Sequence, residues 1–227
     1  MHLSRHVERI RPSGTIRLAD MARRCAASGA KVHDLAEGES GFDTPAHVVE
    51  AARQAALEGQ TRYTPVAGTA ALREAVAGKF RRENGLECGA DGVIVGTGAK
   101  QLIYTALRAG LDEGDEAIVP APYWTSYPEI VKLAGGVPRI VPCVGTGSKL
   151  TPEALAAAVS PRTRFLILNS PSNPGGAVYT ACELLALAEV LRGHPRVSVL
   201  SDDIYEKILF RDEPFATLAQ VAPDLAG

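Results

Sequence analysis

The sequence contains few cysteines, and their arrangement excludes the common cysteine-based sites. Cys25, Cys88, Cys143 and Cys182 are widely separated, and no two of them form a Cys-x-x-Cys pair. Zinc sites and small disulfide scaffolds both need cysteines at close, regular spacings. We therefore expect free thiols and no metal.

Long hydrophobic runs and an excess of charge of one sign are also missing. The 227 residues carry a formal net charge of −2, so the chain offers no basic surface for nucleic acid. The N-terminal residues include no apolar run of the length that a secretory signal or a membrane span requires. These absences predict a cytoplasmic protein whose partners are neither nucleic acids nor membranes.

What the sequence does contain is an alternation of short β-branched runs with longer segments of helical period. This alternation predicts an α/β fold of three layers, a mostly parallel sheet flanked by helices. The expected strands are 92–95, 116–120, 137–141, 164–168 and 197–200. The expected helices are 15–28, 45–57, 69–84, 99–110, 123–134, 152–159 and 181–192. Thr151 and Thr180 are expected to cap helix N-termini, and Gly135 to end a helix.

The segment Ser201-Asp202-Asp203-Ile204-Tyr205 directly follows an expected buried strand. A carboxylate and a phenol at a strand end suit pyridoxal 5'-phosphate (PLP). The carboxylate keeps the pyridine nitrogen protonated, which makes the ring an electron sink, and the phenol can hydrogen-bond the 3-oxygen. This interpretation requires the chain to leave the strand at or just after Asp202. The alternative is an aspartate that only forms a turn or caps a helix.

A glycine turn, Gly96-Thr97-Gly98-Ala99-Lys100, lies between an expected strand and an expected helix. The amides at a helix N-terminus can hold a phosphate, and Gly98 would allow close approach. It matches neither the P-loop pattern nor the full dinucleotide-binding pattern. An ordinary strand-to-helix turn is the alternative.

Two further segments follow expected strands. Trp124 lies among prolines and could stack on a flat ring, or could simply fill the core. Asn173 lies between prolines that could direct its amide into a cleft, or could belong to a plain turn. All these segments stand at the carboxyl ends of strands, where ligands bind in open α/β sheets.

In their order along the chain, these segments resemble the class I/II, fold type I PLP-dependent aminotransferases, especially the prokaryotic aspartate aminotransferase subgroup. The matching segments are 37–39, 42–45, 63–68, 82–86, 98–101, 122–128, 169–174 and 201–206. The resemblance implies PLP as cofactor, an amino acid and a 2-oxo acid as substrates, and a homodimer. It places an N-terminal segment with a helix and a substrate-side loop at 1–44, and a PLP-binding large domain at 45–227.

The resemblance assigns the cofactor contacts residue by residue. Asp202 would contact the pyridine nitrogen, Tyr205 and Asn173 the 3-oxygen, and Trp124 the face of the ring. The implied phosphate contacts are the backbone of Gly98, Ala99 and Lys100, together with Tyr63 acting on the phosphate of a partner subunit. The implied substrate contacts are Gly38, Ser13, Thr15 and Lys100, the last on a distal carboxylate.

Two departures from the family pattern concern specificity and catalysis. The usual Gly-Glu-Pro-Asp-Phe is replaced by Gly38-Glu39-Ser40-Gly41-Phe42, which loosens a loop over the substrate. Family members continue into a segment with the Schiff-base lysine and then into a small C-terminal domain, and neither is expected in this chain. We expect no catalytic residue among the 227 and an inactive isolated chain. Two hypotheses stay open, namely the N-terminal part of an aminotransferase and a non-catalytic PLP-site remnant or dimerisation partner.

Overall fold

The computed structural model describes residues 2, 4–11, 14–35, 38 and 40–225, which form two compact units. The sheet unit comprises Met1–Arg11 and Ala70–Gly227, and the N-terminal unit comprises Pro12–Thr69. These two units are the parts of the chain that are compact in themselves. The resemblance instead divides the chain by expected function, into 1–44 and 45–227, and that division stays a prediction.

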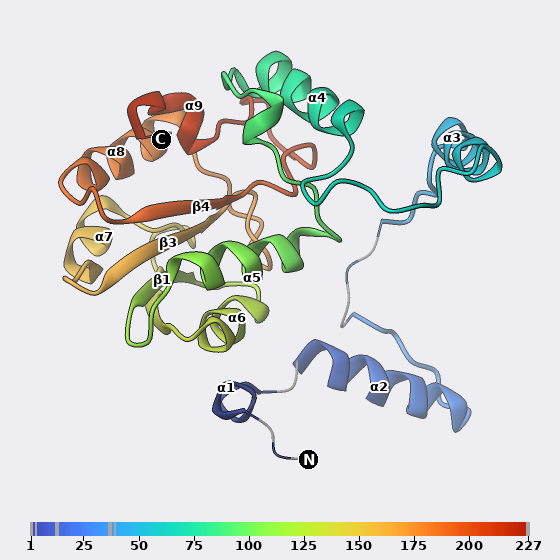
Figure 1. Ribbon diagram of the computed structural model, residues 1–227. Helices are drawn as coiled ribbons and strands as arrows, with labels where there is room; N and C mark the ends of the chain where they lie inside the picture. Colours follow the sequence, from blue (N-terminus) through green and yellow to red (C-terminus); the bar gives the residue numbers. More distant parts are fainter. Residues whose placement is uncertain (1, 3, 12–13, 36–37, 39, 226–227) are drawn as a thin grey trace. The chain divides into compact units, whose positions relative to one another are not determined.

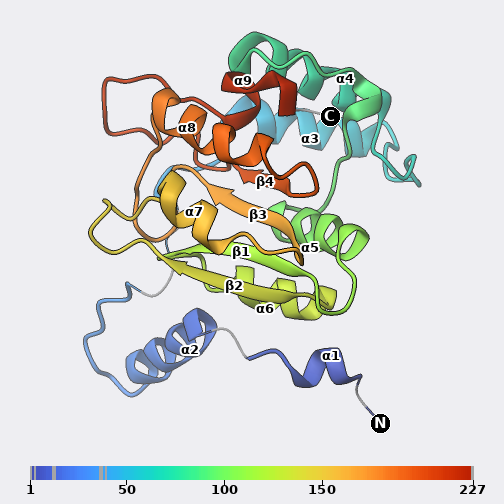
Figure 2. The same cartoon turned by 90° about the vertical axis from the view of Figure 1, so that its left-hand side faces the viewer.

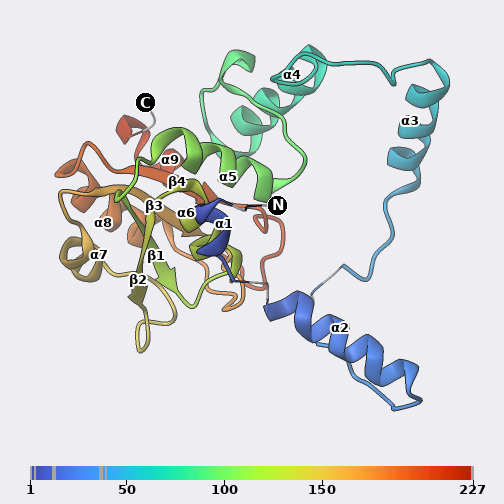
Figure 3. The ribbon, with the colours of Figure 1, turned by 60° about the horizontal axis from the view of Figure 1, so that its bottom comes forward.

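Within the described residues, the sheet unit holds a four-stranded sheet in the order β2-β1-β3-β4. The strands are β1 (Glu116–Ala121), β2 (Val137–Pro142), β3 (Thr163–Asn169) and β4 (Ser198–Asp202). Figure 2 shows this order from bottom to top. All three pairings are parallel, and Figure 3 shows the arrows of β1 and β2 pointing the same way. The predicted parallel sheet is confirmed.

Helices cover both faces of the sheet (Figure 1). One face carries α5 (Ala99–Gly110) and α6 (Ser126–Ala134), and the other carries α7 (Pro152–Ala158), α8 (Ala181–Arg192) and α9 (Leu218–Val221). Alternate residues of a strand point to opposite faces. In β1, Ala117 and Val119 therefore join the core with α5 and α6, while Ile118 joins the core with α7 and α8. The predicted three-layer arrangement is confirmed.

Side-chain caps begin two of these helices. The Thr151 hydroxyl accepts a hydrogen bond from the Ala154 amide at 3.2 Å. The Thr180 hydroxyl accepts from the Glu183 amide at 3.2 Å, and the Glu183 carboxylate accepts from the Thr180 amide at 2.8 Å, which completes a capping box. Both predicted N-caps are confirmed, and Gly135 ends α6 with a φ of 103°.

The predicted strand at 92–95 is wrong. The 3₁₀ helix η2 (Ala90–Gly92) takes its first residue. Val93 is extended, but no strand of the described chain pairs with it, and its carbonyl accepts from the Arg73 guanidinium at 3.0 Å. A β-branched run becomes a strand only when a neighbouring strand supplies hydrogen bonds.

The remaining helices of the sheet unit are α1 (Arg5–Glu8), α4 (Ala70–Lys79), the π-helix η1 (Phe80–Asn84) and the 3₁₀ helix η3 (Pro223–Leu225). The sequence did not predict the short helices α1 and η3. The N-terminal unit contains α2 (Gly14–Ala27) and α3 (Ala46–Leu57). The predicted helix 69–84 is confirmed, but it changes to a π-helix for its last turn.

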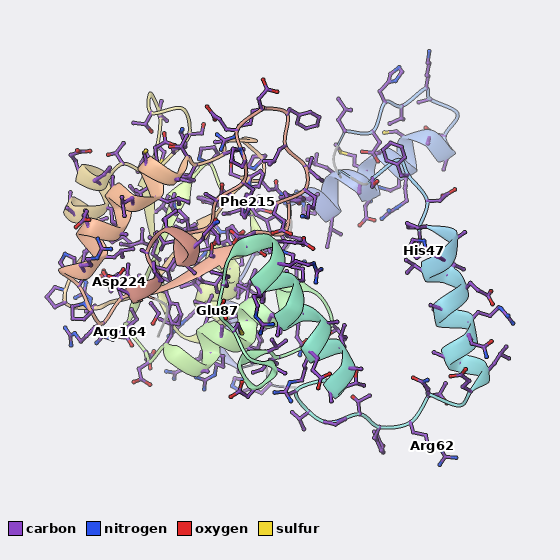
Figure 4. The ribbon with its side chains drawn as sticks, turned by 90° about the horizontal axis from the view of Figure 1, so that it is seen from above. His47, Arg62, Glu87, Arg164, Phe215 and Asp224 are labelled. Carbon is purple, nitrogen blue, oxygen red and sulfur yellow. The ribbon has the colours of Figure 1, made fainter. Side chains whose placement is uncertain are left out.

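Ion pairs join elements at the rim of the sheet unit. The Arg192 guanidinium of α8 contacts the Asp224 carboxylate of η3 at 2.7 Å, and Arg164 of β3 contacts Asp115 at 3.5 Å. Figure 4 labels Asp224 and Arg164. Such pairs contribute at most about 1 kcal/mol each, so the buried cores determine the fold. None of the helices in the described ranges has the length and apolarity needed to cross a bilayer.

Candidate functional site

The expected site residues gather where β1, β3 and β4 end. Asp202 is the last residue of β4 and Asn169 is the last residue of β3, so both lie at the same edge of the sheet. The prediction that the chain leaves the strand just after Asp202 is confirmed. After β1 a loop leads to α6, which begins at Ser126 and not at the predicted position 123. Trp124 therefore lies on this loop.

A chain of hydrogen bonds joins the ends of β3 and β4. The Asn173 side-chain amide lies 3.5 Å from the Tyr205 hydroxyl. The Asn173 backbone amide donates to the Asn169 Oδ1 at 2.7 Å, and the Asn169 Nδ2 donates to the Asp202 carbonyl at 2.7 Å. Asn173, Tyr205 and Asp202 are each partly exposed. Their polar groups are thus positioned by protein contacts and still accessible to a ligand.

A second series of contacts runs from Asp202 toward α5. The buried Tyr127 hydroxyl donates to the Asp202 Oδ2 at 2.6 Å. Burial, followed by this hydrogen bond, raises the pKa of Tyr127, so the phenol stays a donor. The Tyr127 ring meets the Trp124 ring edge to face at 5.3 Å between centroids, and the Lys100 Nζ lies 5.0 Å from the Trp124 ring centroid. Among the described residues, the Asp202 Oδ1 has only a long contact, 3.4 Å from the Ile204 amide, and so keeps acceptor capacity.

The glycine turn before α5 presents backbone amides. Gly98 is the N-cap residue with a φ of 89°, a conformation that favours glycine, and it has no side chain to accept from the first turn. The amides of Ala99 and Lys100 lie in this first turn and have no acceptor inside the helix. The Gly98 amide itself donates to the Gly96 carbonyl at 2.9 Å. Ala99 and Lys100 are therefore better placed than Gly98 to donate to an anion.

Sequence reasoning missed Tyr127 and Asn169 as site residues. Both lie in segments that the resemblance covers, but neither had a role. Tyr127 follows Trp124 by three residues, and its amide donates to the Trp124 carbonyl at 3.0 Å, a turn that brings the two aromatic rings together. Asn169 ends a buried strand, and a polar residue in that position is a signal for an edge-facing contact.

The remaining predicted contacts fall outside the sheet unit. Tyr63 is fully exposed in the N-terminal unit, Gly38 is exposed there, and Thr15 lies in α2. Ser13 lies outside the described residues. The roles of these four residues stay predictions.

The chemistry of the gathered groups fits PLP. A carboxylate, a phenol with an amide, an aromatic face and the free amides of a helix N-terminus correspond to its ring nitrogen, 3-oxygen, ring and phosphate. A metal would need a different set, and the described residues include no group of three or more His, Cys, Asp or Glu that could hold one.

The family model for class I and II aminotransferases matches residues 30–226. The chain belongs to the class I and II aminotransferases. This family uses PLP, which is the cofactor that the site chemistry fits.

Similar aminotransferases include proteins of known name and structure. An aspartate/prephenate aminotransferase of Cereibacter sphaeroides is 52% identical over 224 residues, which are 98% of this chain and 56% of that protein. The aspartate aminotransferase of Rhizobium meliloti has a TM-score of 0.96 at 44% identity, covering 99% of this chain and 56% of that one. The Thermus thermophilus aspartate aminotransferase with maleate has a TM-score of 0.93 at 45% identity, covering 98% and 58%. The chain thus spans little more than half the length of these aminotransferases.

Replacing Tyr127 by phenylalanine should lower the stability of the fold, because the site loses one hydrogen bond. The variant removes the donor to the Asp202 Oδ2 and keeps the ring against Trp124. We expect the free energy of unfolding to fall by about 1 kcal/mol, measured by urea denaturation. Tyr104→Phe is the matched control, because the Tyr104 hydroxyl on α5 has no hydrogen-bond partner among the described residues. Equal losses in both variants would contradict a role for the Asp202 contact.

Proposed function

We propose that this chain is the N-terminal part of a PLP-dependent aminotransferase. The reaction would move an amino group between an aspartate-like amino acid and a 2-oxo acid. The observation that carries the proposal is the unbroken series of contacts from Lys100 through Trp124, Tyr127 and Asp202. It joins the helix N-terminus to the strand-end carboxylate.

Each residue in this series has a proposed task. Asp202 holds the proton on the pyridine nitrogen, and Tyr127 orients the carboxylate that does so. Tyr205 and Asn173 donate to the 3-oxygen, and Trp124 covers one face of the ring. The Ala99 and Lys100 amides donate to the phosphate, and Gly98 provides the turn. When bound, PLP supplies the electron sink for breaking a bond at the substrate Cα.

The proposed substrate contacts come mainly from the N-terminal unit. Gly38 would lie near the α-carboxylate, with Ser13 and Thr15 nearby, and Lys100 would also attract a distal carboxylate. Tyr63 would reach the phosphate held by the partner subunit of a homodimer. The names of the relatives, aspartate and aspartate/prephenate aminotransferase, support aspartate as the amino donor and a 2-oxo acid such as prephenate as the acceptor.

We also propose that the lysine linking PLP covalently to the enzyme is not one of the six in this chain. Four of the six form ion pairs with glutamates, and these contacts hold their amines away from a nucleophilic role. These four are Lys79, Lys132, Lys149 and Lys207. Lys100 is in the site, but over the Trp124 ring.

A chimera tests the proposed function. The chain is fused to the part of the Cereibacter sphaeroides relative that lies beyond the 56% it matches. With PLP, we expect the chimera to transfer the amino group of aspartate to 2-oxoglutarate, and the 227-residue chain alone to show no turnover. The transfer is measured by oxaloacetate formation. A folded chimera that binds PLP and transfers nothing would contradict the proposal, and so would turnover by the chain alone.

A further inference from the structure

Three polar side chains form a closed ring of contacts that joins the end of α4 and η1 to the turn after β4. The Lys79 Nζ contacts the Glu206 Oε1 at 2.5 Å and donates to the Asn84 Oδ1 at 2.7 Å. The Asn84 Nδ2 donates to the Glu206 Oε2 at 2.9 Å. Figure 1 shows the chain after β4 running beside the α4 and η1 segment. We call these three side chains the Lys79–Asn84–Glu206 cluster.

The cluster is sheltered from solvent. Asn84 is 4% exposed, and the side chains of Lys79 and Glu206 are 29% and 14% exposed. Burial alone raises the pKa of Glu206, but the Lys79 ion pair and the Asn84 hydrogen bond lower it more, so its pKa lies below the usual value. The Asn84 side-chain amide accepts from Lys79 and donates to Glu206, and these two also pair with each other. Each side-chain nitrogen and oxygen of the cluster therefore has a partner.

The π-helix explains how Asn84 reaches this position. After Lys79 the helix widens into η1, which ends at Asn84 and is followed by the C-cap residue Gly85 with a φ of 64°. π-helical turns are rare and occur mostly where a function needs a side chain in an unusual place. Here the last residue of the π-turn is directed at Glu206.

The turn that Glu206 belongs to also carries Tyr205. Two consecutive backbone hydrogen bonds form this turn, from the Glu206 amide to the Asp203 carbonyl at 2.9 Å and from the Ile208 amide to the Tyr205 carbonyl at 2.8 Å. Tyr205 extends from it toward Asn173. Holding the neighbouring residue 206 from behind therefore fixes where the phenol of residue 205 lies.

We propose that Lys79, Asn84 and Glu206 are positioning residues that hold the turn of Tyr205 at the distance its phenol needs to reach the cofactor 3-oxygen. The contact between Tyr205 and the cofactor rests on the proposed function. The position of the turn rests on the hydrogen bonds described above. The cluster does not touch the cofactor. It acts through Tyr205 alone.

The first measurement needs no cofactor. Hydrogen exchange is followed in the wild-type chain, Glu206→Ala and the milder Glu206→Gln. We expect the Glu206→Ala variant to speed exchange of the residue 206 and Ile208 amides by about tenfold or more, with strand β3 amides unchanged. Glu83→Gln is the matched control, because it breaks the exposed Glu83–Lys207 pair between the same two segments. Unchanged exchange in both Glu206 variants would overturn the proposal.

The second measurement asks whether the effect passes through Tyr205. PLP affinity is measured by quenching of Trp124, the only tryptophan of the chain. We expect Glu206→Ala to weaken binding by about tenfold in the wild-type background, and less than about twofold in a Tyr205→Phe background. A merely structural role would give the same loss in both backgrounds and would overturn the proposal. If the wild-type chain bound no PLP by itself, the same affinities would be compared in the chimera, and hydrogen exchange would still decide the positioning role.

Discussion

An Asp202→Asn chain should bind PLP about 100-fold more weakly than the wild-type chain while folding as well. The substitution keeps the shape of the side chain, and the new amide oxygen can still accept from the Tyr127 hydroxyl. What it removes is the negative charge facing a protonated ring nitrogen, and a charge-assisted hydrogen bond of this kind is worth about 3 kcal/mol. The measurement is a titration with PLP, followed by the fluorescence of Trp124.

The neighbouring acid provides the control. Asp203→Asn makes the same chemical change one residue later, at a carboxylate that accepts from the Ser201 hydroxyl at 2.8 Å. Burial raises the pKa of Asp203, while hydrogen bonds from the Thr217 and Ser201 hydroxyls lower it. We expect PLP affinity within about twofold of the wild-type value for this variant. If both variants lost affinity equally, the effect would come from the general field of the acidic pair, and the assignment of Asp202 would be wrong.

The parts of the fold that depend on local pattern could be predicted from the sequence. Four of five strands, the N-cap at Thr180 and the helices between the strands follow from periodicity and from the residue types at helix starts. The strand at 92–95 could not be predicted correctly, because its status depends on a neighbour far away in the sequence. The π-turn at η1 leaves no periodic signal, since it changes the helix for only five residues.

The candidate site divides in the same way. Asp202 was predictable because a carboxylate at the end of a buried strand is conspicuous in a sequence. Tyr127 was not, because its partner Asp202 is 75 residues away, and its direction depends on where α6 begins. With the helix starting at Ser126, Tyr127 lies in the first turn and faces the strand ends. A three-residue error in a helix start rotates every later side chain by most of a turn.

The largest effect on stability should come from Leu107→Ala. Leu107 is fully buried on α5, four residues after the buried Ile103, and both pack against the sheet in the core that contains Val119 and Tyr127. Truncation leaves a cavity in this core, so the free energy of unfolding should fall by about 3 kcal/mol. Urea denaturation measures the loss, and an unchanged slope of the transition would show that the native and unfolded states are otherwise comparable.

The same substitution links the core to the site. The glycine turn that offers the Ala99 and Lys100 amides is the start of α5, so a helix that packs less firmly holds these amides less firmly. PLP stabilises only the state that binds it, and the shift in the unfolding midpoint that saturating PLP produces should be smaller in Leu107→Ala than in the wild-type chain.

Leu57→Ala is the control, because Leu57 is 68% exposed at the end of α3. We expect it to change the free energy of unfolding by less than about 0.5 kcal/mol. If Leu107→Ala lowered the free energy of unfolding by as little as this, the core would not hold α5 in place. The position of the glycine turn before α5 would then have to depend on other contacts.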